Sequence, residues 1–234
     1  PPLSSAAATA AADREGALVR DAAKRVDEMK WQAPRIRRMH GLRGDTRVGM
    51  ALFLDEQAAT VPDATFFLWE GRAFSYAQAD RRVDNVGRGL IHCGVRRGDL
   101  VAVLMGPRPS YLSMVAALSR LGAVPILLSP SRSRETLEDA IHGSAPRHRV
   151  ADPDTAALGK ELSDEVLVLG GANEERRLPS GVVDMERIDP DAVELPAWYE
   201  PNPGCARDMA LIMLTAGRGQ KPRAAMITHQ RWAF

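Results

Sequence analysis

One stretch near the end of the sequence combines residue types that suit the binding of a polyanion. It runs from Thr215 to His229, and its glycines and basic side chains are Gly217, Gly219, Arg218, Lys221 and Arg223. Glycine lets backbone N–H groups approach phosphate oxygens without a Cβ in the way, and an arginine can bind two oxygens at once. The composition is typical of a phosphate-binding loop, and the alternative is a solvated basic turn between a strand and a helix.

The residues on either side of this loop predict regular structure. Leu211 to Leu214 form a short apolar run, long enough for a buried strand that leads into the loop. Met226 and Ile227 resume the apolar run after it. Thr228 can cap a helix that begins near His229.

The spacing resembles the phosphate-binding loop of the adenylate-forming superfamily, which includes acyl-CoA synthetases, fatty acyl-AMP ligases, luciferases and peptide-synthetase adenylation domains. That loop reads Thr-Ser-Gly-Thr-Thr-Gly-x-Pro-Lys-Gly-Val-x-x-Thr-His. Laid on it without gaps, the positions that agree are Thr215, Gly217, Pro222, Thr228 and His229, while Arg223 replaces the lysine with its charge kept. The resemblance implies that pyrophosphate is held by Thr215, Gly217, Arg218, Gly219, Lys221 and Arg223. His229 is a further candidate, with a structural histidine at a helix start as the alternative.

The loop also departs from the family pattern. Ala216, Arg218 and Gly219 stand where the family has hydroxyl residues, and Gln220 stands where it has glycine. Two interpretations follow: either the guanidinium of Arg218 substitutes for hydroxyls, or the chain is a catalytically inactive homologue that acts as a structural or interaction domain.

Three further segments resemble the family in the family's own order. They are Phe74-Ser-Tyr76, the run that begins at Gly98-Asp99, and Leu118 to Val124 followed by Ser129-Pro130. Together with the loop they imply the N-terminal part of the adenylate-forming synthetase fold, an α/β fold with mostly parallel sheet layers covered by helices. The Thr-His-Gln-Arg-Trp ending favours the fatty-acyl branch, closest to a bacterial fatty-acyl-CoA synthetase or long-chain fatty-acid–CoA ligase.

This resemblance implies a two-step ligation that uses ATP, Mg²⁺ and CoA. A fatty acid carboxylate attacks the α-phosphate of MgATP to give acyl-AMP and pyrophosphate, and the CoA thiol then displaces AMP. A fatty acyl-AMP ligase, which passes the acyl group to a carrier-protein thiol, is an alternative. The family's late catalytic lysine lies beyond Phe234, so we expect this chain to be a portion of a longer enzyme and inactive by itself.

Alternating apolar runs and helical stripes predict the elements that position the loop. The expected strands cover 66–69, 73–75, 100–105, 123–128, 148–151 and 166–169, and the expected helices cover 49–60, 75 to about 90, 110–121, 134–142 and 156–162. Ser75 and Gln78 have the spacing of a capping box. Pro125 cannot donate a ladder hydrogen bond, so its strand is expected to be irregular or near an edge. Strands alternating with helices imply parallel pairing.

The sequence predicts four regions along the chain. They are an Ala-rich lead with a basic helical extension (1–48), an α/β subdomain (49–169), a Pro/Gly-rich connection without regular structure (170–207), and a strand, the loop and the start of a helix (208–234, a truncated domain). The extension carries a helical stripe from Asp13 and a basic stretch around Trp31. Residues 13–47 are therefore a candidate for peripheral membrane contact, with a solvated arm as the alternative.

Composition narrows the classes of protein. A formal net charge of +1 argues against a dedicated nucleic-acid binder. Cys93 and Cys205 have no metal-ligand spacing, which indicates reduced thiols in a cytoplasmic protein, and the five histidines show no paired metal-ligand pattern either. His92 beside Cys93 is interpreted as packing rather than a nucleophile–base pair, because neighbouring residues on a helix do not face each other.

Overall fold

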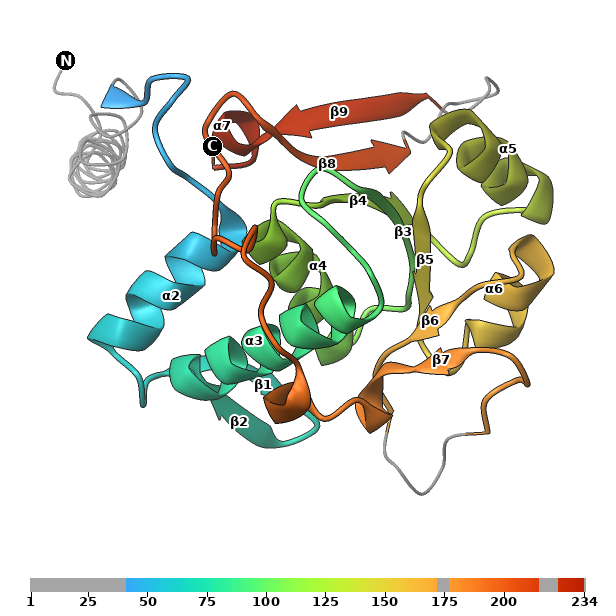
Figure 1. Ribbon diagram of the computed structural model, residues 1–234, viewed down its shortest axis with the longest axis horizontal. Helices are drawn as coiled ribbons and strands as arrows, with labels where there is room; N and C mark the ends of the chain where they lie inside the picture. Colours follow the sequence, from blue (N-terminus) through green and yellow to red (C-terminus); the bar gives the residue numbers. More distant parts are fainter. Residues whose placement is uncertain (1–40, 172–176, 215–222, 234) are drawn as a thin grey trace, which may run out of the picture. The chain divides into compact units, whose positions relative to one another are not determined.

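The computed structural model describes residues 41–171, 177–214 and 223–233, and the chain divides into two units, Pro1–Arg43 and Gly44–Phe234. Almost all of the first unit, and so the predicted helix from Asp13 and most of the basic extension, lies outside the described residues. The architecture below is that of the second unit (Figure 1). No helix within the described residues is both long enough and apolar enough to cross a membrane.

The second unit is built on a seven-stranded sheet with the order β7-β6-β5-β3-β4-β8-β9. Its first six strands in this order are parallel to their neighbours and β9 is antiparallel to β8. The bounds are β3 Leu100–Leu104, β4 Val124–Leu128, β5 His148–Ala151, β6 Leu167–Val168, β7 Val183–Asp184, β8 Met209–Leu214 and β9 Ala224–Thr228. A separate antiparallel hairpin joins β1 (Thr65–Trp69) to β2 (Arg72–Ser75). The mostly parallel α/β fold expected from the sequence is confirmed.

Helices cover both faces of this sheet, as the apolar contacts show (Figure 1). Val101 and Val103 of β3 pack in one cluster with residues of α3 (Tyr76–His92) and α4 (Pro109–Leu121). Ala102 and Leu104 point to the other face, where they cluster with residues of α5 (Arg134–Ser144) and α6 (Ala156–Leu162). This alternation explains why β3 reads as a continuous apolar run, since a strand buried on both faces has no polar side.

Local signals account for the ends of several helices. Ser75 and Gln78 form the predicted capping box at the start of α3, with the Ser75 N–H donating to Gln78 Oε1 at 3.0 Å. Pro109 stands in the first turn of α4, and Gly122 ends that helix with φ of 71°, a left-handed conformation that favours glycine. Earlier in the chain, α2 (Met50–Thr60) also agrees with its predicted range.

At Pro125 the expectation of a locally edge-like strand holds. β4 lies inside the sheet, but it pairs with β8 only from Ile126, so the missing N–H falls where β4 has a neighbour on one side. Two other expectations fail. The connection 170–207 contributes a two-residue edge strand, β7, and two short 3-10 turns, Met185–Arg187 and Pro190–Ala192. Beyond the predicted loop, the chain returns as β9 before its helix begins.

The predicted end of α5 is also wrong. The helix runs through Gly143 to Ser144, and Ala145 takes the left-handed cap with φ of 44°. The physical reason is Pro146, which disfavours helical geometry at the residue before it and so places the cap at Ala145 rather than at the glycine.

A buried arginine ties three helices together. Arg120 of α4 is 4% exposed, and its guanidinium pairs with Asp55 of α2 and, at 2.5 Å, with Asp80 of α3. Asp84 of α3 lies 3.7 Å from the same guanidinium, and Asn202 donates its side-chain N–H to Asp55 at 2.6 Å. The helices on this face are therefore joined by a charge network as well as by apolar packing.

Candidate functional site

The loops that follow parallel strands meet at the carboxyl edge of the sheet, which is the usual place for ligands in open α/β folds. In register, Leu127 lies beside Met213 and Ile126 beside Ile212, so the ends of β4 and β8 are level. β8 therefore ends at this edge, at Leu214, next to the turn that follows β4. That turn contains Ser129 and Ser131, whose hydroxyls are 2.8 Å apart.

The predicted phosphate-binding segment connects the two strands of a hairpin rather than a strand and a helix. Leu214 at the end of β8 pairs with Ala224 at the start of β9, so both ends of the segment are held side by side. Arg223 is exposed at the carboxyl edge, directly before β9. The other loop candidates, Thr215, Gly217, Arg218, Gly219 and Lys221, lie outside the described residues.

The structure does not bring His229 to this end of the hairpin. It follows Thr228, whose partner Met209 begins β8, so the whole of β9 separates it from Ala224. Five residues of antiparallel strand span about 17 Å. Thr228 does cap α7 (His229–Trp232), as predicted, by accepting a hydrogen bond from the Arg231 N–H at 3.2 Å.

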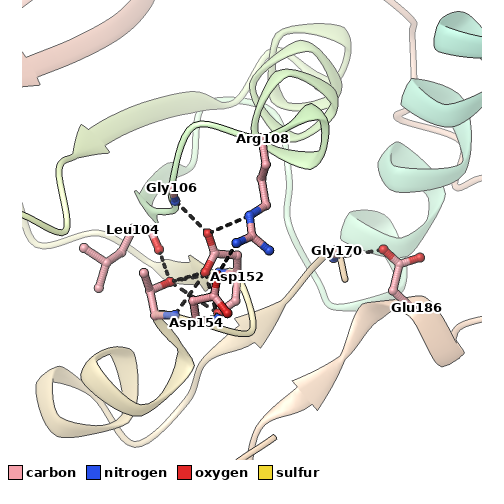
Figure 2. A network of polar contacts seen from close by, with 8 residues as sticks. Leu104, Gly106, Arg108, Asp152, Asp154, Gly170 and Glu186 are labelled. Atoms are coloured by element: carbon pink, nitrogen blue, oxygen red, sulfur yellow. Dashed lines mark hydrogen bonds and ion pairs between the residues drawn. The ribbon is translucent and has the colours of Figure 1, made fainter. Parts of the chain in front are cut away.

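A compact acid–base cluster occupies the carboxyl ends of β3 and β5, where the strand order reverses (Figure 2). Asp152 is completely buried and accepts hydrogen bonds from the N–H groups of Gly106 at 2.6 Å and Thr155 at 3.0 Å. Arg108 forms ion pairs with Asp152, at 3.5 Å, and with Asp154. Both acids already neutralise Arg108. These contacts hold the turn after β3 against the turn after β5, and the crevice is therefore not suited to an anion.

A cavity of about 250 Å³ lies between α5 and the β4–β8–β9 side of the sheet. Its walls include both ends of the predicted phosphate segment, Leu214 and Ala224, together with Ile126 and Ile212 of the sheet. Among the described residues that line it, Asp139 of α5 is the acidic one. The base of the loop is thus mostly apolar, with polar groups on the helix side.

The structure also shows how burial affects two other residues considered from the sequence, Cys93 and His229. Burial raises the pKa of the Cys93 thiol to about 11, so this cysteine is a protonated thiol at neutral pH and a poor nucleophile. Burial lowers the pKa of His229, with a smaller opposing effect from Asp208, so its imidazole is neutral at pH 7.

One basic side chain of the predicted phosphate segment lies within the described residues. Arg223 is exposed beside the carboxyl end of β8, and a guanidinium can bind two phosphate oxygens at once. Within residues 41–171, 177–214 and 223–233, no group of three His, Cys, Asp or Glu side chains could hold a metal ion.

Comparison with known proteins supports this picture. Among curated proteins, a feruloyl-CoA synthase of Amycolatopsis sp. is 29% identical over 181 residues, covering 77% of this chain and 33% of the relative. The human long-chain fatty acid transport protein 6 is 26% identical over 206 residues, covering 82% of this chain and 33% of its own length. The chain thus spans about a third of the length of these relatives.

A solved structure shows the same fold. The apo structure of MbtA from Mycobacterium smegmatis superposes with a TM-score of 0.65 at 24% identity, covering 86% of this chain and 36% of that one. The family model described as "AMP-binding enzyme" matches residues 54–234, well over half of the sequence. The resemblance seen in the sequence is confirmed: this chain belongs to the AMP-binding family of adenylate-forming enzymes.

Proposed function

We propose that this chain provides the phosphate-binding part of an ATP-dependent fatty acid–CoA ligase, which activates a carboxylate as acyl-AMP and transfers it to a thiol. The observation that supports this best is the hairpin at the carboxyl edge: β8 and β9 hold a glycine-rich basic segment where ligands bind in open α/β sheets. Adenylation needs stabilisation of charge that moves between phosphate oxygens. Backbone N–H groups and fixed cations supply it.

In this proposal each group of the chain has a defined role. Gly217 and Gly219 let the backbone approach the phosphates, while Arg218, Lys221 and Arg223 neutralise the pyrophosphate that leaves. Thr215 contributes a hydroxyl hydrogen bond to a phosphate oxygen. MgATP and the fatty acid are substrates, and CoA is the acceptor by analogy with the acyl-CoA synthetases among the relatives.

A second candidate function has its own supporting observation. Ala216, Arg218 and Gly219 stand where the family has hydroxyl residues, which favours a catalytically inactive homologue with a structural or interaction role. A third candidate keeps adenylation but uses a carrier-protein thiol in place of CoA, as a fatty acyl-AMP ligase does.

ATP–pyrophosphate exchange on the full-length protein separates the first two candidates. We expect exchange that depends on an added fatty acid, tested from short to long chains, and a loss of at least tenfold in kcat/KM for Lys221→Ala, the magnitude typical of removing one charge-stabilising donor. Arg134→Ala is the matched control, since Arg134 of α5 is an exposed arginine paired with Glu138 of α5 and Glu161 of α6. A folded protein that exchanges with no acid would refute the ligase proposal.

Two further measurements refine the answer. The triple substitution Ala216→Ser, Arg218→Thr and Gly219→Thr restores the family's hydroxyls. A loss of exchange in this variant would show that Arg218 has taken over a phosphate-binding role, whereas a gain would indicate a weakened loop. Release of AMP upon addition of CoA or of a carrier protein then identifies the thiol acceptor.

A further inference from the structure

The buried imidazole of His229 occupies a slot between two glycines that are distant in sequence. His229 is 4% exposed, and it lies where the chain passes from β9 into α7. A Cβ added to Gly204 would lie 2.6 Å from its Nε2, and a Cβ added to Gly49 would lie 3.7 Å from its Cε1. The contact at Gly204 is closer than real Cβ atoms approach, so an alanine there would displace the ring.

Backbone contacts around the slot join three segments. The His229 N–H donates to Asp208 O at 2.9 Å, and the Gln230 N–H donates to Ala206 O at 2.9 Å. The Val48 N–H donates to Gly204 O at 3.1 Å, directly before Gly49, the N-cap of α2. The turn after β9 is therefore docked on the segment 204–208 and on the start of α2.

The ring at the centre of this docking is not explained by hydrogen bonding. Among the described residues, His229 Nδ1 is buried without a hydrogen-bond partner, and so is the hydroxyl of Ser119 that borders Gly49. A buried polar atom without a partner costs free energy. What the imidazole supplies is shape, because it fills the space that the two glycines leave open.

β9 depends on this docking more than the other strands near it. Within the part of the chain that the structure describes, β9 is an edge strand that pairs with β8 alone, and its residues Ala224 and Met226 are exposed. One of its ends begins at the predicted phosphate segment and the other ends at His229. The position of the whole strand is thus set by the β8 ladder and by the slot.

We infer that His229 is a positioning residue: its imidazole, held between Gly49 and Gly204, fixes the return strand of the nucleotide-binding hairpin. This inference rests on the proposed ATP-dependent function for its effect on activity. It gives His229 no contact with nucleotide, because about 17 Å of strand lies between it and the loop end of β9. The slot acts through the backbone of β9.

A double-mutant cycle tests the slot itself. Gly204→Ala should lower the ratio of folded to unfolded protein about tenfold in urea titrations, as overpacking does. The same change in a His229→Ala background should cost much less, about twofold at most, since the ring that clashes is gone. Gly44→Ala is the matched control, because its added Cβ meets only the Arg207 side chain at 3.6 Å. Equal costs in both backgrounds would overturn the inference.

A second pair of measurements separates positioning from general stability. In the full-length protein, His229→Ala should raise the KM for MgATP in pyrophosphate exchange about tenfold while kcat changes about twofold or less, and His229→Asn should lie between it and the wild type. An unchanged KM in folded His229→Ala protein contradicts positioning. Hydrogen exchange provides the readout that needs no activity: the amides of β9 should exchange faster in His229→Ala while those of β3 do not.

The two proposals therefore fail in different ways. If the wild type shows no exchange with any acid, the proposed function fails, and the β9 amides still decide whether His229 positions the hairpin. If exchange is present and neither the KM nor the β9 amides respond to His229→Ala, the positioning role is refuted while the ligase function stands.

Discussion

Replacing Arg120 by methionine should reveal how much the charge network contributes to the helical layer. Methionine keeps the length and much of the apolar stem of arginine but removes the positive charge. The side chain it replaces is buried, since Arg120 is 4% exposed. Asp55 and Asp80 would then face each other with no buried counter-charge. Breaking a buried ion pair by removing one partner typically costs 3–5 kcal/mol.

The partners of Arg120 set the magnitude within that range. The side chains of Asp55, Asp80 and Asp84 are 35%, 33% and 44% exposed, so water screens them partly and we expect a loss near the low end, about 3 kcal/mol. With a urea m-value of about 2 kcal/mol/M, the unfolding midpoint should fall by roughly 1.5 M. The assay is urea unfolding followed by circular dichroism. Arg134→Met, at an exposed pair, should leave the midpoint unchanged.

The pH dependence of stability provides a second, independent test of this prediction. In the folded protein, burial raises the pKa of Asp55, while Arg120 opposes that rise. Removing Arg120 should raise the pKa further, so the folded variant binds protons more readily than the unfolded chain does. The stability deficit should therefore be largest at neutral pH and shrink below about pH 5. A deficit under 1 kcal/mol, or one that does not depend on pH, would refute this account of the network.

Three further changes test other features. Asp152→Asn should lower the unfolding free energy by roughly 2–4 kcal/mol, because a fully buried carboxylate with several N–H donors loses its charge. Asp154→Asn, at a side chain that is 74% exposed, should change the unfolding free energy little. Chemical denaturation of both variants compares them. Ser75→Ala should cost about 1 kcal/mol through loss of the cap, read from the thermal midpoint, and an unchanged midpoint would count against the capping box. Since burial lowers the pKa of His229, the unfolded chain takes up the proton first as pH falls below about 6.5, and stability should drop there; His229→Gln should flatten that part of the stability–pH curve.

Local signals in the sequence were sufficient for most of the elements. β5 and α6 have the predicted bounds, and β3 differs from its predicted range only at its end, because an apolar run or a helical stripe reports burial directly. β7 could not be predicted, since two residues form a strand only by pairing with β6. β9 was missed for a similar reason: it is a partly exposed edge strand, and its Ala-Ala-Met-Ile-Thr run lacks a clear alternation.

The family could be inferred from the sequence because its signal is local: glycines and basic side chains between Thr215 and Arg223 are adjacent in sequence. The phosphate-binding role of these residues stays a prediction. The surroundings of His229 could not be inferred, because Gly49 and Gly204 reach it only through the fold. The ion pairs of Arg120 could not be predicted either. In the sequence it is a charged residue in an apolar helix, and only the fold places Asp55 and Asp80 beside it.

Our placement of the proposed phosphate site depends on which crevice of the sheet is already filled. In open α/β folds the reversal of strand order usually leaves a crevice for the ligand, and here that reversal lies between β3 and β5. Asp152 and Arg108 form an ion pair at that position (Figure 2). Thr155 adds hydrogen bonds to Asp152 and to Leu104 O. We place the proposed phosphate site on the β8–β9 side, where, among the described residues, β9 pairs with β8 alone. A hairpin in that position needs an anchor at its far end, and the His229 slot provides one.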